Sequence, residues 1–140
     1  MRAGIIAIVL TSVVVWLLSG LFYMVLVKDM MMAAQVPFKS VMWTEAEMPS
    51  PVWWLVPLLL MSWLLLRILT QTGGPIATGR GAMWGVTMAV VVAVVQTIGW
   101  CMMFQSYDIQ FTAITIAWEA VQWGIGGAVM AVIYSKLYKA

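Results

Sequence analysis

The sequence predicts an all-α, polytopic membrane protein, a bundle of four transmembrane helices with both termini in the cytoplasm. Three observations predict this fold. The 140-residue chain is 64% hydrophobic and 9% charged, with a mean hydropathy of +1.02, whereas a soluble domain carries about 25% charged residues. Four apolar runs approach or exceed the length of about 20 residues that crosses a bilayer core. The basic residues are distributed unequally between the two ends of these runs.

The whole chain, residues 1–140, is expected to form one membrane domain. The first run has no charge and is longer than the apolar part of a cleaved signal peptide, about 7–15 residues, so we expect a retained anchor. The second is shorter and ends around Arg67, and Pro57 falls in its first turns, where proline is tolerated. The third is uncharged, and the fourth holds one charged residue, Glu119. The predicted spans are residues 3–27, 52–69, 82–104 and 109–134.

The basic residues predict the orientation. Lys28 and Lys39 fall in the first linker, residues 28–51, which is the only sizeable loop, and the third linker has no lysine or arginine. The other five basic residues fall at the N-terminus, in the second linker and at the C-terminus. Because loops rich in lysine and arginine stay in the cytoplasm, both termini are expected inside and residues 28–51 outside.

Composition excludes several classes of chemistry. The chain has no histidine and one cysteine, Cys101. Histidine-ligated haem, Ser-His-Asp triads and sites built on cysteine pairs are therefore excluded. The net charge of +2 is small and dispersed, so no nucleic-acid partner is expected. We expect a non-enzymatic protein with no evident cofactor and no metal site.

Small residues recur every fourth position in the third and fourth spans. This spacing lets helix backbones approach closely inside a membrane. It predicts packing faces, either within the chain or against another subunit. The candidate packing residues are Gly81, Gly85, Ala89, Ala93, Gly124 and Gly127.

Glu119 is the most informative residue, because a charged side chain at the centre of a span costs about 2.5–3.5 kcal/mol on insertion scales. At about 1.5 Å per residue, it lies roughly 10 Å below the outer edge of its helix. Other strong hydrogen-bonding groups fall at similar depths, which predicts a polar layer in the outer half of the bundle. The layer is expected to contain Glu119, Gln122, Gln96, Ser19 and Ser62.

Arg67 is predicted to lie about 10 Å from Glu119 along the axis, too far for a simple ion pair. Without a cation, desolvation favours the neutral carboxylic acid over a salt-bridged carboxylate. Two interpretations remain. In one, Glu119 is hydrogen-bonded to Gln96, Gln122 or a partner subunit and fixes helix register. In the other, it binds a proton, a cation or a ligand in an outward-facing pocket.

Tryptophan is abundant, with nine residues, and four of them are predicted to lie deeper than the interfacial belts. Deep indoles can stack on a flat ligand such as a quinone or a pigment, but core packing is the more common use. The deep indoles are Trp16, Trp63, Trp118 and Trp123.

Both ends of the chain carry short segments that resemble small bacterial four-helix membrane proteins grouped as families of unknown function. The segments are Leu18-Ser19-Gly20-Leu21-Phe22-Tyr23 followed by Lys28, Trp118-Glu119-Ala120, and Gly126-Gly127-Ala128-Val129-Met130-Ala131. The resemblance implies a four-span bundle in the bacterial inner (cytoplasmic) membrane and no particular reaction. Similarity to small multidrug transporters stops at size, because their membrane glutamate is in the first helix, which has no acid here.

Three functions follow as hypotheses. The first is an accessory or assembly subunit of a larger membrane complex, with membrane lipid and other membrane subunits, or copies of itself, as partners. The second is a small oligomeric transporter in which Glu119 titrates. The third is a protein that binds a lipid, quinone or pigment through the deep indoles.

Overall fold

The structure is a computed structural model of the chain that describes residues 2–26, 28–29, 50–71, 73–103 and 109–138, with a few side chains in these ranges excepted. The described residues are helical apart from short connections. The elements are α1 (Arg2–Leu21), the π-helix η1 (Phe22–Leu26), the 3₁₀-helix η3 (Pro51–Trp54), α3 (Leu55–Thr70), α4 (Thr78–Met103) and α5 (Ile109–Tyr138).

Four helical segments in this part of the chain are long and apolar enough to cross a membrane, which confirms the predicted number of membrane-length helices. Helix boundaries differ slightly from those expected. α4 begins at Thr78 and α5 continues to Tyr138, so each extends about one turn beyond its apolar run. A helix satisfies its own backbone hydrogen bonds, so it can continue where polar side chains begin. The predicted outer loop lies almost entirely outside the described residues. The membrane-length segments are Arg2–Leu26, Val52–Thr70, Thr78–Gln96 and Thr112–Tyr138.

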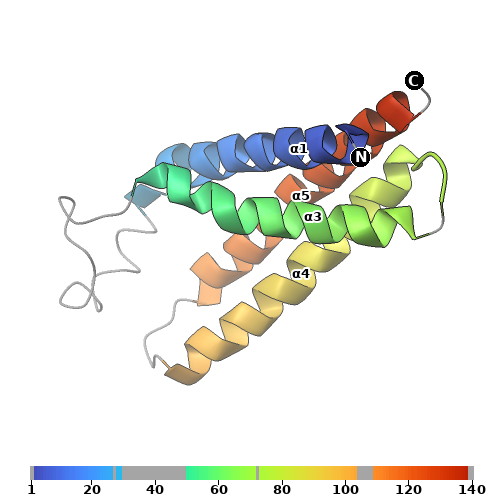
Figure 1. Ribbon diagram of the computed structural model, residues 1–140. Helices are drawn as coiled ribbons and strands as arrows, with labels where there is room; N and C mark the ends of the chain where they lie inside the picture. The colour runs from blue at the N-terminus through green and yellow to red at the C-terminus, as the bar shows by residue number, and fades with distance from the viewer. Residues whose placement is uncertain (1, 27, 30–49, 72, 104–108, 139–140) are drawn as a thin grey trace.

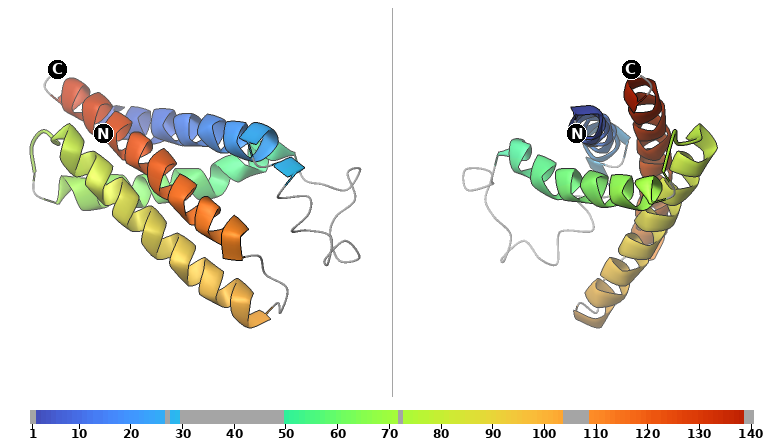
Figure 2. Two further views of the ribbon diagram at one scale, coloured as in Figure 1. Left: turned by 180° about the vertical axis from the view of Figure 1, so that it is seen from behind. Right: turned by 45° about the vertical axis from the view of Figure 1, so that its right-hand side comes forward.

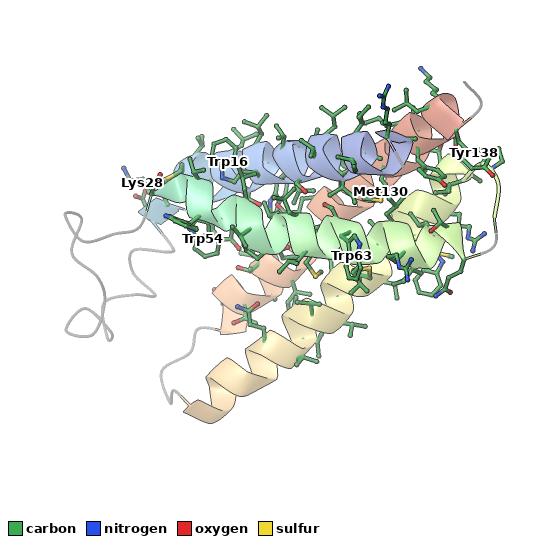
Figure 3. All side chains as sticks on the ribbon, viewed as in Figure 1. Trp16, Lys28, Trp54, Trp63, Met130 and Tyr138 are labelled. Atoms are coloured by element: carbon green, nitrogen blue, oxygen red, sulfur yellow. The ribbon has the colours of Figure 1, made fainter. Side chains whose placement is uncertain are left out.

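The helices form two antiparallel pairs, α1 with α3 and α4 with α5, and α1 also packs along α5 (Figure 1). The pairs converge at the end that holds both termini and diverge toward the other end, as Figure 2 shows from two further directions. Arg2, Arg67, Arg80 and Lys136 all belong to helix ends at the convergent end, whereas Lys28 lies at the divergent end (Figure 3).

Each connection that the structure describes has a local cause. At the start of η3, Ser50 accepts a hydrogen bond from the Val52 amide at 3.5 Å, and Pro51 occupies the first helical position, where its missing N–H costs nothing. Between α3 and α4, Gly73 and Gly74 adopt φ angles of 69° and 73°, which only glycine adopts without strain.

The turn after these glycines is fastened to α5. The Ser135 hydroxyl donates to the Ile76 carbonyl at 3.0 Å and accepts from the Ile76 amide at 2.7 Å. Ile76 is buried, so these bonds satisfy backbone groups that water does not reach. These two hydrogen bonds join the last part of α5 to the connection between α3 and α4, at the convergent end of the bundle.

α4 and α5 approach so closely that their backbones touch. A Cβ added to Gly81 would overlap the Gly127 carbonyl, and one added to Gly85 would overlap the Trp123 carbonyl. The two contacts also fix the antiparallel register, which places Ala89 level with Glu119. Ala89 and Ala93 are buried on the same helix. The predicted stripe of small residues on α4 therefore packs within the chain.

The hydrophobic core lies mainly in the convergent half. Leu65 and Leu69 from α3 belong to this core together with Met130 and Ala131 from α5, and all four are fully or almost fully buried. Met130 lies between the helices in Figure 3. Further core members are Ala7, Val15, Leu66, Ile76, Met88, Ala89 and Trp123.

Candidate functional site

Glu119 points toward the interior of the helix assembly. It is half-buried and lies one turn before Trp123, which is 3% exposed and belongs to the core. The Gln122 amide donates to Glu119 Oε2 at 2.6 Å, and Trp123 contributes a second side-chain hydrogen bond to the same carboxyl group. Residues three and four positions apart share a helix face, so α5 itself supplies both donors.

The hydrogen-bonded chain continues onto α1. The Ser19 hydroxyl donates to Gln122 Oε1 at 2.9 Å, so Gln122 connects Ser19 to Glu119. Gln122 is fully buried, and a buried amide requires such partners because an unpaired one is costly. We call Ser19, Gln122 and Glu119 the polar cluster.

An aromatic contact between α5 and the end of the first helix involves residues next to the polar cluster in the sequence. Phe22 is buried and stacks on Trp118, with ring centroids 4.7 Å apart and planes at 5°. Tyr23 meets Phe22 edge to face at 5.0 Å. Phe22 opens the π-helix η1, and π-turns within helices are often found at functional sites. The π-turn and the stack are features that apolar periodicity does not predict.

Two of the five predicted layer residues lie elsewhere. Ser62 belongs to a separate contact, in which Ser12 Oγ lies 2.9 Å from Ser62 Oγ and 3.2 Å from the Leu58 carbonyl. Ser12 precedes Ser19 by seven residues, so this contact lies about 10 Å nearer the convergent end. Depth estimates from helix ends placed Ser62 too far outward, because α1 and α3 are offset along their axes.

Gln96 is exposed and also lies away from the polar cluster. The register of α4 against α5 places it level with Thr112 rather than with Glu119. That difference of seven residues corresponds to about 10 Å. The depths of Gln96 and Glu119 were counted from outer ends of the third and fourth spans that were taken to be level, whereas the contacts of Gly81 and Gly85 offset these two ends along the axis. Of the partners expected as alternatives for Glu119, the structure shows Gln122 bonded to it, and Gln96 lies too far away.

A polar stripe on α5 went unnoticed in the sequence. Thr112 and Thr115 precede Glu119 and Gln122 at positions i, i+3, i+7 and i+10, which lie on one face of a helix. Thr112 is buried and Thr115 half-buried. The spacing of these four hydrogen-bonding residues is visible in the sequence, where the predicted layer included Glu119 and Gln122 but not the two threonines.

No lysine or arginine among the described residues pairs with Glu119. The Arg67 guanidinium lies instead over the Trp63 ring, 5.9 Å from its centroid, on the exposed side of α3. This arrangement agrees with the expectation that Arg67 is not a simple partner of Glu119. The part of the chain that the structure describes also holds no group of three metal-ligating side chains.

The deep indoles are used in different ways. Trp123 is part of the core, and Trp118 stacks on Phe22 with a buried N–H that has no acceptor among the described residues. Trp63 is 52% exposed on α3 (Figure 3).

A second stripe of small residues on α5 lies on a different face from Gly127. It lines a shallow apolar groove of about 460 Å³ between α4 and α5, which is wide open to the surroundings. Gly124 forms part of the groove floor, where an added Cβ would lie 3.0 Å from Val86 Cγ2. The groove residues are Ala82, Val86, Ala120, Val121, Gly124, Ile125 and Ala128.

The fold and the candidate site define a small all-helical protein with four membrane-length helices and one hydrogen-bonded carboxyl group among them. Comparison of the chain with models of known protein families, with curated proteins and with solved structures finds no match. The resemblance to small bacterial four-helix membrane proteins stays a prediction.

Proposed function

We propose that this protein is a non-enzymatic subunit of a larger membrane assembly, which it joins by packing its helices against another membrane-spanning helix. The observation that supports this most strongly is the groove between α4 and α5. Gly81, Gly85 and Gly127 are used to pack the chain against itself. Ala120, Gly124 and Ala128 repeat the same spacing on another face of α5, where Ala82 and Val86 of α4 border them on one side.

Contact with lipid creates no need for small side chains, whereas close contact between helices does. A groove with a small-residue floor and Val121 and Ile125 at its sides fits the ridge of another helix. In this proposal the groove is the docking site for a helix of a partner subunit or of a second copy of this chain.

The proposal includes insertion in the bacterial inner membrane with both termini in the cytoplasm. The clustering of Arg2, Arg67, Arg80 and Lys136 at the convergent end supports this orientation. A reporter fused to the C-terminus tests it. A fluorescent protein that matures only in the cytoplasm is expected to be active there, and activity of a periplasmic reporter instead would show the reverse orientation.

Ala128→Leu is the direct test of the groove. The larger side chain fills the groove without touching Gly81 or Gly85, so the chain is expected to fold while losing its association with partner subunits. The assay is the mass of the complex purified in mild detergent, measured by light scattering. Val91→Leu, at an exposed position of α4 outside the groove, is the matched control. A monodisperse monomer from the unmodified chain would refute the proposal.

A second candidate function is transport coupled to titration of Glu119. It is favoured by the hydrogen bond that Gln122 donates to Glu119, because Gln122 also accepts from Ser19 and so links the carboxyl group to α1. Glu119→Gln is then expected to abolish proton-coupled flux in liposomes, and unchanged flux would exclude this mechanism.

The third hypothesis, a bound lipid, quinone or pigment, has less support, because Trp118 and Trp123 pack within the chain. Absorbance and mass spectrometry of the purified protein test it.

A further inference from the structure

One face of α3 carries a row of exposed side chains that changes from apolar to polar toward the convergent end. Its members recur every three or four residues, so they lie on one face of the helix. They are Val56, Leu60, Trp63, Arg67 and Gln71, which we call the α3 stripe. All five are exposed, Leu60 and Trp63 by 63% and 52%. Gln71 is the C-cap residue and keeps helical φ and ψ angles of −58° and −27°, so it continues this face.

The Arg67 guanidinium is positioned by an aromatic ring and leaves its donors available. It lies over Trp63, with 5.9 Å from Cζ to the ring centroid, which is the distance of a cation–π contact. The guanidinium makes no hydrogen bond or ion pair with any residue that the structure describes. Arginine presents five N–H donors in a planar fork that matches the oxygen atoms of a phosphate group. The arrangement therefore suits a phosphate ligand.

The charge of the convergent end favours an anion. Arg67 is one of the four basic residues that lie at helix ends there. The acids among the described residues are Asp29, next to Lys28 at the divergent end, and Glu119, in the half of α5 nearer that end. No carboxylate side chain in the described ranges therefore lies at the convergent end, and an anionic ligand is complementary to it in charge.

The apolar part of the α3 stripe distinguishes a lipid from a helix as the ligand. Close contact between helices in a membrane uses small residues, whereas Val56, Leu60 and Trp63 are large. A flexible acyl chain packs along large side chains without this restriction. Toward the convergent end the stripe continues with an indole, a guanidinium and an amide, and Arg67 and Gln71 are about 6 Å apart along the axis. This order matches a phospholipid, from acyl chain to phosphate.

We infer that the α3 stripe binds one anionic phospholipid. Arg67 and Gln71 hold its phosphate, and one acyl chain lies along Trp63, Leu60 and Val56. The inference requires the membrane insertion that the proposed function includes, but neither the groove nor a partner subunit. Basic side chains at a membrane surface attract anionic lipids. The contact with Trp63 restricts the Arg67 side chain before the lipid binds, which lowers the entropy lost on binding.

Native mass spectrometry of the full chain in detergent measures binding of the first lipid molecule. Titration with phosphatidylglycerol, and with phosphatidylcholine of the same acyl chains, gives a dissociation constant for each. Phosphatidylglycerol is expected to bind at least about fivefold more tightly, the factor that one basic residue contributes at a membrane surface. Arg67→Gln removes the charge and is expected to abolish this preference.

Two controls isolate the site. Lys136→Gln removes the same charge from an exposed position of α5 at the same end, and it is expected to keep the full preference. Inorganic phosphate at the concentration of the lipid is expected not to displace it, because free phosphate makes no contact with the apolar part of the α3 stripe. Arg67 and Lys136 are both exposed, so the variants are expected to fold, and unchanged helix content by circular dichroism is required of each.

Equal affinity for the two lipids would overturn the inference, and so would a preference that survives Arg67→Gln. An equal loss in Lys136→Gln would also overturn it, because the preference would then come from the charge of the whole convergent end. Displacement by inorganic phosphate would identify free phosphate as the ligand instead of a lipid. None of these results bears on the groove, which Ala128→Leu tests separately. A chain that purifies as a monomer and still prefers phosphatidylglycerol would refute the larger assembly while supporting the lipid site.

Discussion

The α4–α5 and α1–α3 interfaces join antiparallel helices by opposite means. α4 and α5 touch through their backbones at Gly81 and Gly85, where not even a methyl group fits. α1 and α3 meet through side chains, with Ser12 hydrogen-bonded to Ser62 and Leu66 packed over Gly4. The first interface depends on the absence of side chains, whereas the second depends on particular side-chain groups. The two are therefore expected to respond very differently to small substitutions.

This difference matters for function, because α5 belongs to the rigid pair and carries Glu119. Backbone contact fixes the distance from α4 to α5 within narrow limits. α1 can adjust more readily, since its contacts with α3 are made by rotatable side chains. The polar cluster joins the two pairs at the level where they begin to separate.

The largest effect is expected for Gly85→Ala. Its methyl group would overlap the Trp123 carbonyl, so the two helices must separate. We expect a loss of about 3 kcal/mol in the free energy of unfolding, at the upper end for overpacked sites. The measurement is SDS titration in mixed micelles followed by circular dichroism. Gly79→Ala, with no atom within 4 Å of the added Cβ, is the control. Equal stability of the two variants would refute the backbone contact.

The next effect is expected for Ser135→Ala, which removes both hydrogen bonds to Ile76. A buried amide and carbonyl are then left unpaired, at a cost of about 2 kcal/mol. Amide exchange should accelerate at Ile76. Thr87→Ala, whose exposed hydroxyl bonds to the Met83 carbonyl of its own helix, should change neither quantity. An unchanged rate of amide exchange at Ile76 would show that Ser135 does not form these hydrogen bonds.

A smaller effect is expected for Ser62→Ala at the α1–α3 interface. Side-chain hydrogen bonds between membrane helices contribute about 0.6 kcal/mol on average, with a maximum of about 1.7. We expect a loss of about 1 kcal/mol, measured by the same titration. A double-mutant cycle with Ser12→Ala isolates the coupling between the two hydroxyl groups. If Ser62→Ala lowered the free energy of unfolding as much as Gly85→Ala does, the α1–α3 and α4–α5 interfaces would not differ in their sensitivity to small substitutions.

The smallest effect is expected for Gly20→Ala. Gly20 lies on α1 in an exposed position, and an added Cβ would meet no atom within 4 Å. Replacing glycine by alanine within a helix stabilises it by about 0.5 kcal/mol or slightly more. A small gain in the unfolding titration is expected, and a marked loss would reveal a contact at this face.

The number of helices and their approximate limits could be predicted because apolar length and composition are local properties of the chain. The close approach of α4 and α5 was foreseeable for the same reason, since Gly81 and Gly85 repeat at the spacing that such contacts use. The sequence left open whether this stripe served the chain itself or another subunit. On α5, the face with Gly127 and the face with Gly124 both carry small residues. The spacing of these residues does not tell which face packs against α4 and which faces outward.

The candidate site was predicted in part. Glu119 and Gln122 share a helix face, so their contact follows from spacing alone. Ser19 required the register of α1 against α5, and depth counted from the helix end gave a sufficient estimate. The same method failed for Gln96 and Ser62, because the true ends and offsets of α3 and α4 differ from those of their apolar runs.

By itself, the sequence determined that this protein forms four apolar helices with one acidic side chain among them, because hydropathy and helical periodicity act over short stretches. The tertiary structure decided which helices touch, how they are offset and where they separate. Those properties arise from contacts between residues far apart in the chain, such as Gly85 with Trp123 and Ser19 with Gln122. The position of Glu119 level with Ala89 and beside Gln122 is a consequence of these contacts.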